Sequence, residues 1–124
     1  MFTVIKMATL IASLSTGKGT WAEVSKLIGM EQWSKIILIG NSFAKDNFQK
    51  PQNAEFIEID PLRPLSSIKK TILDSLKEKV TDLEIMLNLT SGSGKEHMAI
   101  LSALLSLGLG IRFVSPGIEG LEEL

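Results

Sequence analysis

The sequence predicts an α/β protein with a three-layer, Rossmann-like fold, in which a mainly parallel sheet of about five strands carries helices on both faces. Short apolar runs rich in β-branched residues alternate with longer segments whose apolar residues recur at helical spacing. The strand-like runs are nearly continuous in apolar character, as expected for strands buried on both faces. The chain has 124 residues, which suits one domain spanning 1–124.

The first element is a predicted strand over 2–12, where apolar and β-branched residues dominate. The stretch 13–19 that follows is rich in Ser, Thr and Gly and predicts a loop. Thr20 and Glu23 have the spacing of a capping box, so we expect a helix to begin there. This helix is predicted to end near Gly29.

The middle of the chain predicts two further strands and a helix. The run 35–40 and the run 55–60 are apolar enough for buried strands, and the polar stretch 41–53 between them predicts a loop. Because no clear helix joins these strands, their order in the sheet is left open. A helix is predicted over 65–80, where apolar residues form one stripe and most lysines lie outside it.

The last third predicts a strand at 84–90, a helix at 95–107 and a strand at 111–114, after which "SPG" turns the chain away. This last helix is apolar on nearly every side. It therefore either lies beneath other elements or forms a subunit interface, to which Trp33 and Phe43 are further candidates.

Composition excludes several classes of protein. The net charge of −1 argues against a nucleic-acid coat, although it leaves room for a local basic pocket. The absence of cysteine excludes disulfides, thiolate nucleophiles and zinc–cysteine sites, and the single histidine gives no basis for a transition-metal centre. We find no signal peptide, and the longest apolar stretch, 98–109, is too short to cross a membrane. We expect a cytoplasmic protein without a metal or cofactor.

Three loops are placed to bind a ligand, because ligands of open α/β sheets bind beyond the carboxyl ends of the strands. These loops are 13–19, 41–46 and 88–95. The first and third combine glycine, hydroxyl residues and one lysine each, a chemistry that favours an anion such as phosphate. Ordinary turns and helix caps explain the same composition equally well.

Common nucleotide motifs are absent. A Walker A loop around Lys95 needs glycine where Leu89 stands and Ser or Thr where Glu96 stands. No G-x-G-x-x-G follows the first predicted strand, so a standard dinucleotide site has no support. His97 is either a general base or an ordinary, partly exposed residue in the first turn of its helix. The carboxylates show no spacing that singles out an acid–base pair.

The segment "NLTSGSGK" at 88–95, leading from a strand into an apolar helix, resembles the second motif of CRISPR-associated Rossmann-fold (CARF) domains. The weaker "ATLIASLSTGKGT" at 8–20 is similar to their first motif. In that family a basic residue directly follows the hydroxyl after the glycine, whereas here Gly94 intervenes before Lys95. By order of elements, the resemblance covers nearly the whole chain.

The resemblance implies a homodimer that binds a cyclic oligoadenylate, most often the tetramer, in a cleft across its two-fold axis. It implies no membrane partner, and no direct DNA binding by this chain alone. We add Asn41, from the second loop, to the positions that the two motifs carry over. The candidate ligand-binding residues are Ser13, Ser15, Thr16, Gly17, Asn41, Asn88, Thr90, Ser91, Gly92, Ser93 and Lys95.

Four functions remain open. The chain is a sensor, alone or within a longer regulator that carries a DNA-binding or nuclease effector. It is a metal-independent ring nuclease, in which the ribose 2′-OH attacks the adjacent phosphate and Lys95 and Ser13 are the catalytic candidates. It is another nucleotide- or phosphate-binding Rossmann-like domain. Or it is a structural dimerisation domain whose loops are plain turns.

Overall fold

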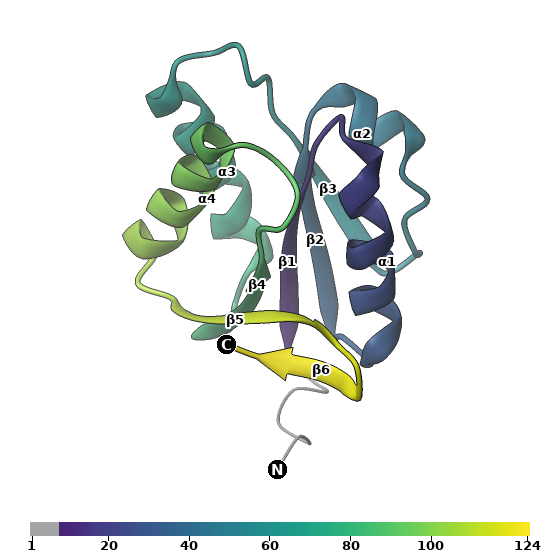
Figure 1. The fold of residues 1–124 in the computed structure, drawn as a ribbon. Coiled ribbons are helices and arrows are strands. Elements are labelled where there is room, and N and C mark those ends of the chain that lie inside the picture. The colour runs from purple at the N-terminus through teal and green to yellow at the C-terminus, as the bar shows by residue number, and fades with distance from the viewer. Residues whose placement is uncertain (1–7) are drawn as a thin grey trace.

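The computed structural model describes residues 8–124, which form one six-stranded sheet flanked by helices (Figure 1). The strand order is β3-β2-β1-β4-β5-β6; neighbours among the first five strands are parallel, and β6 runs antiparallel to β5. The strands are β1 (Thr9–Leu14), β2 (Lys35–Gly40), β3 (Ala54–Glu58), β4 (Glu84–Asn88), β5 (Gly110–Gly117) and β6 (Gly120–Glu123). The helices are α1 (Trp21–Met30), α2 (Ser42–Asn47), α3 (Leu65–Lys79) and α4 (Gly94–Ser106), with a 3₁₀ turn, η2 (Lys18–Thr20), before α1.

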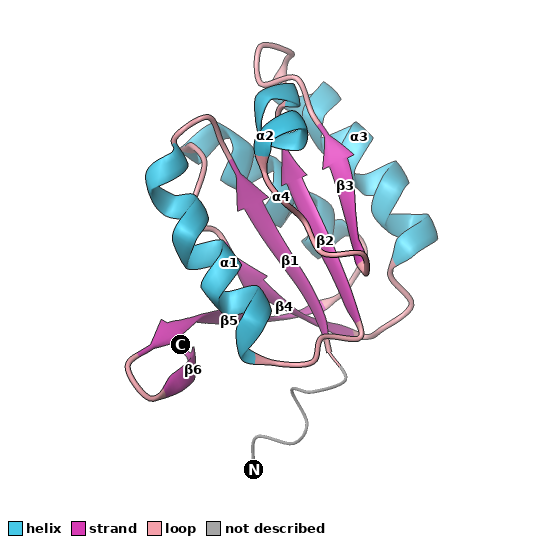
Figure 2. Cartoon of the chain, turned by 90° about the vertical axis from the view of Figure 1, so that its right-hand side faces the viewer, coloured by secondary structure: helices cyan, strands magenta, loops and turns pink. Residues whose placement is uncertain are grey.

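The predicted three-layer α/β fold is confirmed. Helices α1 and α2 cover one face of the sheet, and α3 and α4 cover the other (Figures 1 and 2). Successive residues of the central strand β1 serve opposite faces: Leu10 belongs to the core under α1, and Ile11 to the core under α3 and α4. Because all six residues of β1 are buried, the strand reads as a continuous apolar run.

The first strand ends later than its composition predicts. Of the predicted strand at 2–12, residues 2–7 lie outside the described part of the chain. The strand continues to Leu14, and Ser13 pairs in register with Ile39 of β2. Tertiary pairing explains the difference, since β1 is held by β2 on one side and β4 on the other.

A short helix stands where a loop was predicted. Helix α2 occupies 42–47, and its start is fixed by Asn41, whose side-chain oxygen accepts a hydrogen bond from the amide of Ala44 at 2.9 Å. Ala44 and Phe48 are the apolar residues that α2 and its end bury. Two buried residues leave no clear helical stripe, so the pattern of hydrophobicity missed this helix.

The predicted capping box at Thr20 is wrong. Thr20 has helical backbone angles (φ −92°, ψ −8°), and its hydroxyl donates to the carbonyl of Gly17 at 3.3 Å instead of capping α1. The 3₁₀ turn places Thr20 inside the helical path. A capping box is present at the start of α4, where the Glu96 carboxylate accepts from the amide of Ser93 at 2.6 Å.

The chain does not turn away at "SPG". Strand β5 runs through these residues to Gly117, and a tight turn then leads into β6, which the sequence did not predict. Gly120 has a φ of +121°, a conformation that favours glycine, so the "GIEG" segment marks the turn. The added strand makes β6 one edge of the sheet and β3 the other.

The apolar helix α4 is buried on one side only. Ala99, Ile100 and Ala103 lie in the core, whereas Met98 is 59% exposed and Leu105 is 68% exposed. Trp33 is buried, and its ring NH donates to the Leu27 carbonyl at 3.1 Å, so it is a core residue and no part of a surface. Within residues 8–124, no helix has the length and apolar character needed to span a membrane.

One ion pair makes the stability of this fold depend on pH. The Lys79 ammonium lies 2.7 Å from the Glu55 carboxylate, and this hydrogen bond, with the positive charges of Lys79, Lys35 and Lys50, lowers the pKa of Glu55. Because the pKa is lower in the folded state, the stabilisation is present above the pKa of the unfolded chain and is lost as the pH falls through the folded pKa.

Replacing Lys79 by methionine should therefore lower the free energy of unfolding at pH 7 by about 0.2–1 kcal/mol, the range for a largely exposed pair. The difference from the wild type should shrink at pH 3, where Glu55 is protonated in both proteins. Urea unfolding at the two pH values measures this. Lys77→Met, an exposed lysine on the same helix, is the control. A Lys79→Met deficit that stays the same at pH 3 would contradict the assignment.

Candidate functional site

The loops after β1 and β4 flank the point where the strand order reverses. Strand β1 pairs with β2 on one side and β4 on the other. Figure 1 shows the chain leaving β1 toward α1 on one face of the sheet and leaving β4 toward α4 on the other. In sheets of this kind such a reversal opens a crevice at the carboxyl ends of the strands, where ligands bind.

Ser91 joins these two loops. Its side-chain oxygen accepts a hydrogen bond from the amide of Ser15 at 3.0 Å, and the two serine hydroxyls lie 3.2 Å apart. The buried hydroxyl of Ser13 donates to the Ser91 carbonyl oxygen. The structure therefore brings the first and third predicted loops into direct contact, with Ser91 between them.

The geometry determines which hydroxyl is free. Ser91 is 1% exposed, so its hydroxyl hydrogen must be donated within the protein, and Ser15 Oγ is the acceptor within reach. Ser15 Oγ also accepts from the amide of Gly17 at 3.3 Å. The hydroxyl hydrogen of Ser15 is therefore free to donate to a group outside the protein, whereas Ser13 and Ser91 use theirs internally.

His97 and Glu96 hold the third loop in shape. His97 Nε2 lies 2.8 Å from the Ser91 carbonyl oxygen, and because a carbonyl only accepts, this nitrogen carries the proton. Gly92 between them has a φ of +104°, and a Cβ there would lie 3.0 Å from Glu96 Oε1 and 3.1 Å from His97 Nε2. The loop needs glycine at this position, and His97 acts as its brace.

Asn88, at the end of β4, is turned into the protein. It is 3% exposed; its amide nitrogen donates to the Val114 carbonyl at 2.9 Å, and its side-chain oxygen accepts from the Thr90 amide at 3.1 Å. Asn88 thus shapes the loop from behind. The exposed residues of this loop are Thr90, Ser93, Gly94 and Lys95.

The second predicted loop joins the first through a side-chain contact. Asn41 Nδ2 donates to the Thr16 hydroxyl at 2.9 Å, while Asn41 Oδ1 caps α2. Thr16 and Gly17 are exposed. All three loops that sequence reasoning selected therefore meet at one edge of the sheet.

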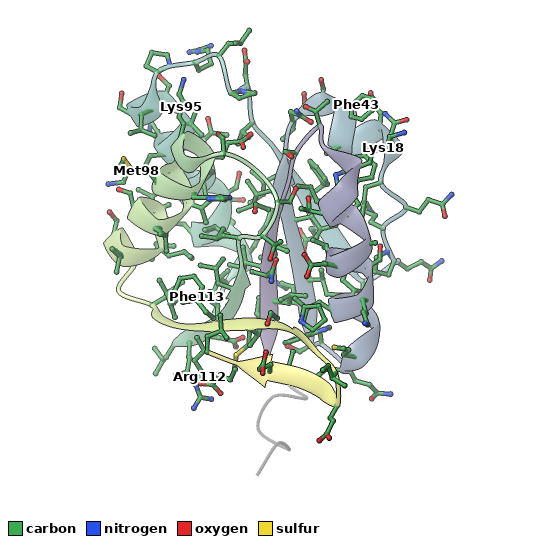
Figure 3. All side chains as sticks on the ribbon, in the orientation of Figure 1. Lys18, Phe43, Lys95, Met98, Arg112 and Phe113 are labelled. Atoms are coloured by element: carbon green, nitrogen blue, oxygen red, sulfur yellow. The ribbon has the colours of Figure 1, made fainter. Side chains whose placement is uncertain are left out.

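Two exposed lysines stand at this edge on opposite sides (Figure 3). Lys95, in the first turn of α4, donates to the carbonyl of Pro61 in the turn between β3 and α3, at 2.9 Å. Lys18 lies over two aromatic rings, those of Trp21 and Phe43. Neither lysine forms an ion pair with a carboxylate among residues 8–124.

Sequence reasoning missed the contribution of Trp21 and Phe43 to this edge. Trp21 was expected only as a helical residue, and Phe43 only as a surface contact. The two rings lie 5.9 Å apart although they belong to α1 and α2, and local sequence carries no signal for a contact between separate elements.

Comparison with known proteins adds no identification. No family model matches the chain, and no curated protein matches it significantly. The functional conclusion therefore depends on the residues and geometry described above.

Proposed function

We propose that this chain binds a cyclic oligoadenylate second messenger in a cleft across a homodimer axis, as a CARF-type sensor domain. The observation that carries the proposal is the contact of two hydroxyl-rich loops, through Ser91, at the reversal of strand order. The likeness of segment 88–95 to the family's second motif supports the choice of ligand.

The charge at this edge suits a ring of phosphates. Lys18 and Lys95 offer ammonium groups, and the free hydroxyl of Ser15 is a further donor. Phosphate oxygens accept from such groups strongly, because one partner is charged. A two-fold axis doubles every donor, which explains how a chain of net charge −1 can hold a symmetric polyanion.

An apolar surface on α4 and β5 supports the dimer. We define the α4–β5 surface as the exposed Met98, Leu105 and Phe113, with the partly buried Leu101 and Ile111 between them. A patch of this kind on a soluble domain is typical of an interface. Because α4 begins at the ligand loop, a contact between two α4 helices near Met98 would place two copies of the site side by side.

The ring-nuclease alternative is less well supported by the geometry. Of its two catalytic candidates, Ser13 is 2% exposed, and its hydroxyl is donated to the Ser91 carbonyl. It is therefore not positioned to touch a ligand. Lys95 is exposed and available to stabilise charge, so product formation is the observation that separates the two functions.

Calorimetric titration with cyclic tri-, tetra- and hexa-adenylate, without metal, tests the proposal. We expect one ring to bind two chains, and a ring at 100 times its dissociation constant should stabilise the fold by about 2.7 kcal/mol. Lys95→Ala should weaken binding about 10- to 150-fold, the effect of losing a charged hydrogen bond. Lys77→Ala, which removes the same charge far from the site, should bind as the wild type does.

Chromatography of the recovered nucleotide completes the test. An intact ring supports the sensor, whereas linear products would assign the ring-nuclease activity instead. If no ring binds or stabilises the wild-type protein, the oligoadenylate proposal is wrong.

A further inference from the structure

A cluster of three aromatic rings adjoins the first loop of the site. Trp21 lies 5.9 Å from Phe43 and 5.7 Å from Phe48, centroid to centroid, and meets Phe48 edge to face. The ring NH of Trp21 donates to the Ser15 carbonyl at 2.8 Å. The residue that offers its hydroxyl to the site therefore also anchors the centre of this cluster.

Phe43 is the exposed member of the cluster. It is 38% exposed, whereas Trp21 is half-buried and Phe48 is buried. It is the second residue of α2, whose start is capped by Asn41, and Asn41 is itself bonded to Thr16 of the first loop. A rigid aromatic face is thus presented to solvent at a position tied directly to the candidate ligand loops.

Lys18 covers this face. Its ammonium lies 5.5 Å from the centroid of Phe43 and 5.9 Å from that of Trp21. A cation over exposed rings is held weakly, whereas a nucleobase stacked on an aromatic side chain is held more strongly. A base can therefore displace Lys18, and the freed ammonium can reach the phosphate attached to that base.

We propose that Phe43 and Lys18 form a nucleobase subsite, in which a purine stacks on the ring of Phe43 and Lys18 binds the neighbouring phosphate. This inference rests on the proposed function, because it assigns a place to the bases of the same ligand. It divides the work at the site: Ser15 and Lys95 contact phosphate and sugar, and Phe43 contacts a base. Stacking needs only a flat ring, so this subsite prefers purines for their larger face without reading their edges.

A protein contact is the competing explanation for an exposed phenylalanine. Phe43 stands on the side of the sheet covered by α1 and α2, whereas Met98, a member of the α4–β5 surface, lies on the opposite side (Figure 3). The ring is therefore not part of the proposed dimer contact. Its neighbours are the ligand loops, which favours a ligand over a subunit.

Titrations with cyclic tetra-adenylate, linear tetra-adenylate and an abasic ribose-phosphate tetramer test the subsite. Phe43→Leu keeps an apolar side chain without an aromatic face and should weaken binding of both adenylates about 5- to 150-fold. Phe43→Trp should retain the affinity, because indole also stacks. The abasic tetramer should bind the wild type and Phe43→Leu equally.

The lysine has a separate readout. Lys18→Met should weaken adenylate binding and reduce the slope of log affinity against log salt by about 0.7, the value for one phosphate contact on a single strand. Lys26→Met, an exposed lysine further along α1, is the matched control and should leave the slope unchanged.

The outcomes separate this inference from the proposed function. If the wild type binds the ring and Phe43→Leu binds it equally well, the subsite is wrong and the sensor proposal stands. If the ring does not bind but linear tetra-adenylate binds through Phe43, the sensor proposal is wrong and the subsite stands. Failure of the wild type to bind either adenylate overturns both. Dissociation of a dimer by Phe43→Leu without ligand would assign Phe43 to a protein contact and overturn the subsite.

Discussion

Replacing Asn88 by leucine is expected to lower the free energy of unfolding by about 2–4 kcal/mol. The amide of Asn88 is buried and satisfies two backbone groups, the Val114 carbonyl and the Thr90 amide. Leucine has a similar size but no polar atoms, so both groups would be left unpaired away from water, each at a cost of about 1–3 kcal/mol. Urea unfolding at pH 7 measures the change.

The control is Asn53→Leu, which alters an exposed asparagine whose bond to the Trp33 carbonyl is long, at 3.4 Å. Its effect should stay within about 0.5 kcal/mol, as for most surface substitutions. The comparison decides between two roles for Asn88, direct contact with a ligand or support of the loop. An Asn88→Leu protein as stable as the wild type would rule out the support role.

Gly40→Ala is the second substitution with a large expected effect. Gly40 ends β2 beside the end of β1, and a Cβ there would collide with the Leu14 carbonyl oxygen and lie 3.2 Å from Cζ of Phe56. Because a backbone oxygen cannot move without moving its strand, we expect a loss of about 1–3 kcal/mol in the free energy of unfolding.

The displacement should also reach the ligand site, since Leu14 leads directly into Ser15. We therefore expect Gly40→Ala to bind cyclic tetra-adenylate more weakly even at temperatures where it is fully folded. Gly29→Ala is the control: no atom lies within 4 Å of its added Cβ, and alanine in α1 should raise stability by about 0.5–1 kcal/mol. Equal stability of the two variants, measured by thermal unfolding, would show that β1 and β2 can separate to admit a side chain.

The elements that sequence missed share a physical cause. Helix α2 and strand β6 each bury few apolar residues, so neither leaves a clear period in the sequence. The capping box shows the same limit from the other side, because Thr20 and Glu23 match the spacing while the preceding 3₁₀ turn gives Thr20 a helical backbone. Motif spacing predicts what a segment can do, and its neighbours decide whether it does so.

The sequence by itself determined the fold class and the edge of the sheet that carries the candidate site. Both follow from local patterns: apolar runs mark buried strands, and glycine and hydroxyl residues mark the loops that follow them. Only the tertiary structure decided which groups face a ligand. Ser13, Asn88 and Ser91 turn inward and Ser15 keeps a free hydroxyl, because their hydrogen-bond partners lie on other strands and loops, 26 to 78 residues away in the chain. Phe43 and Lys18 meet for the same reason, as folding brings α2 beside the first loop.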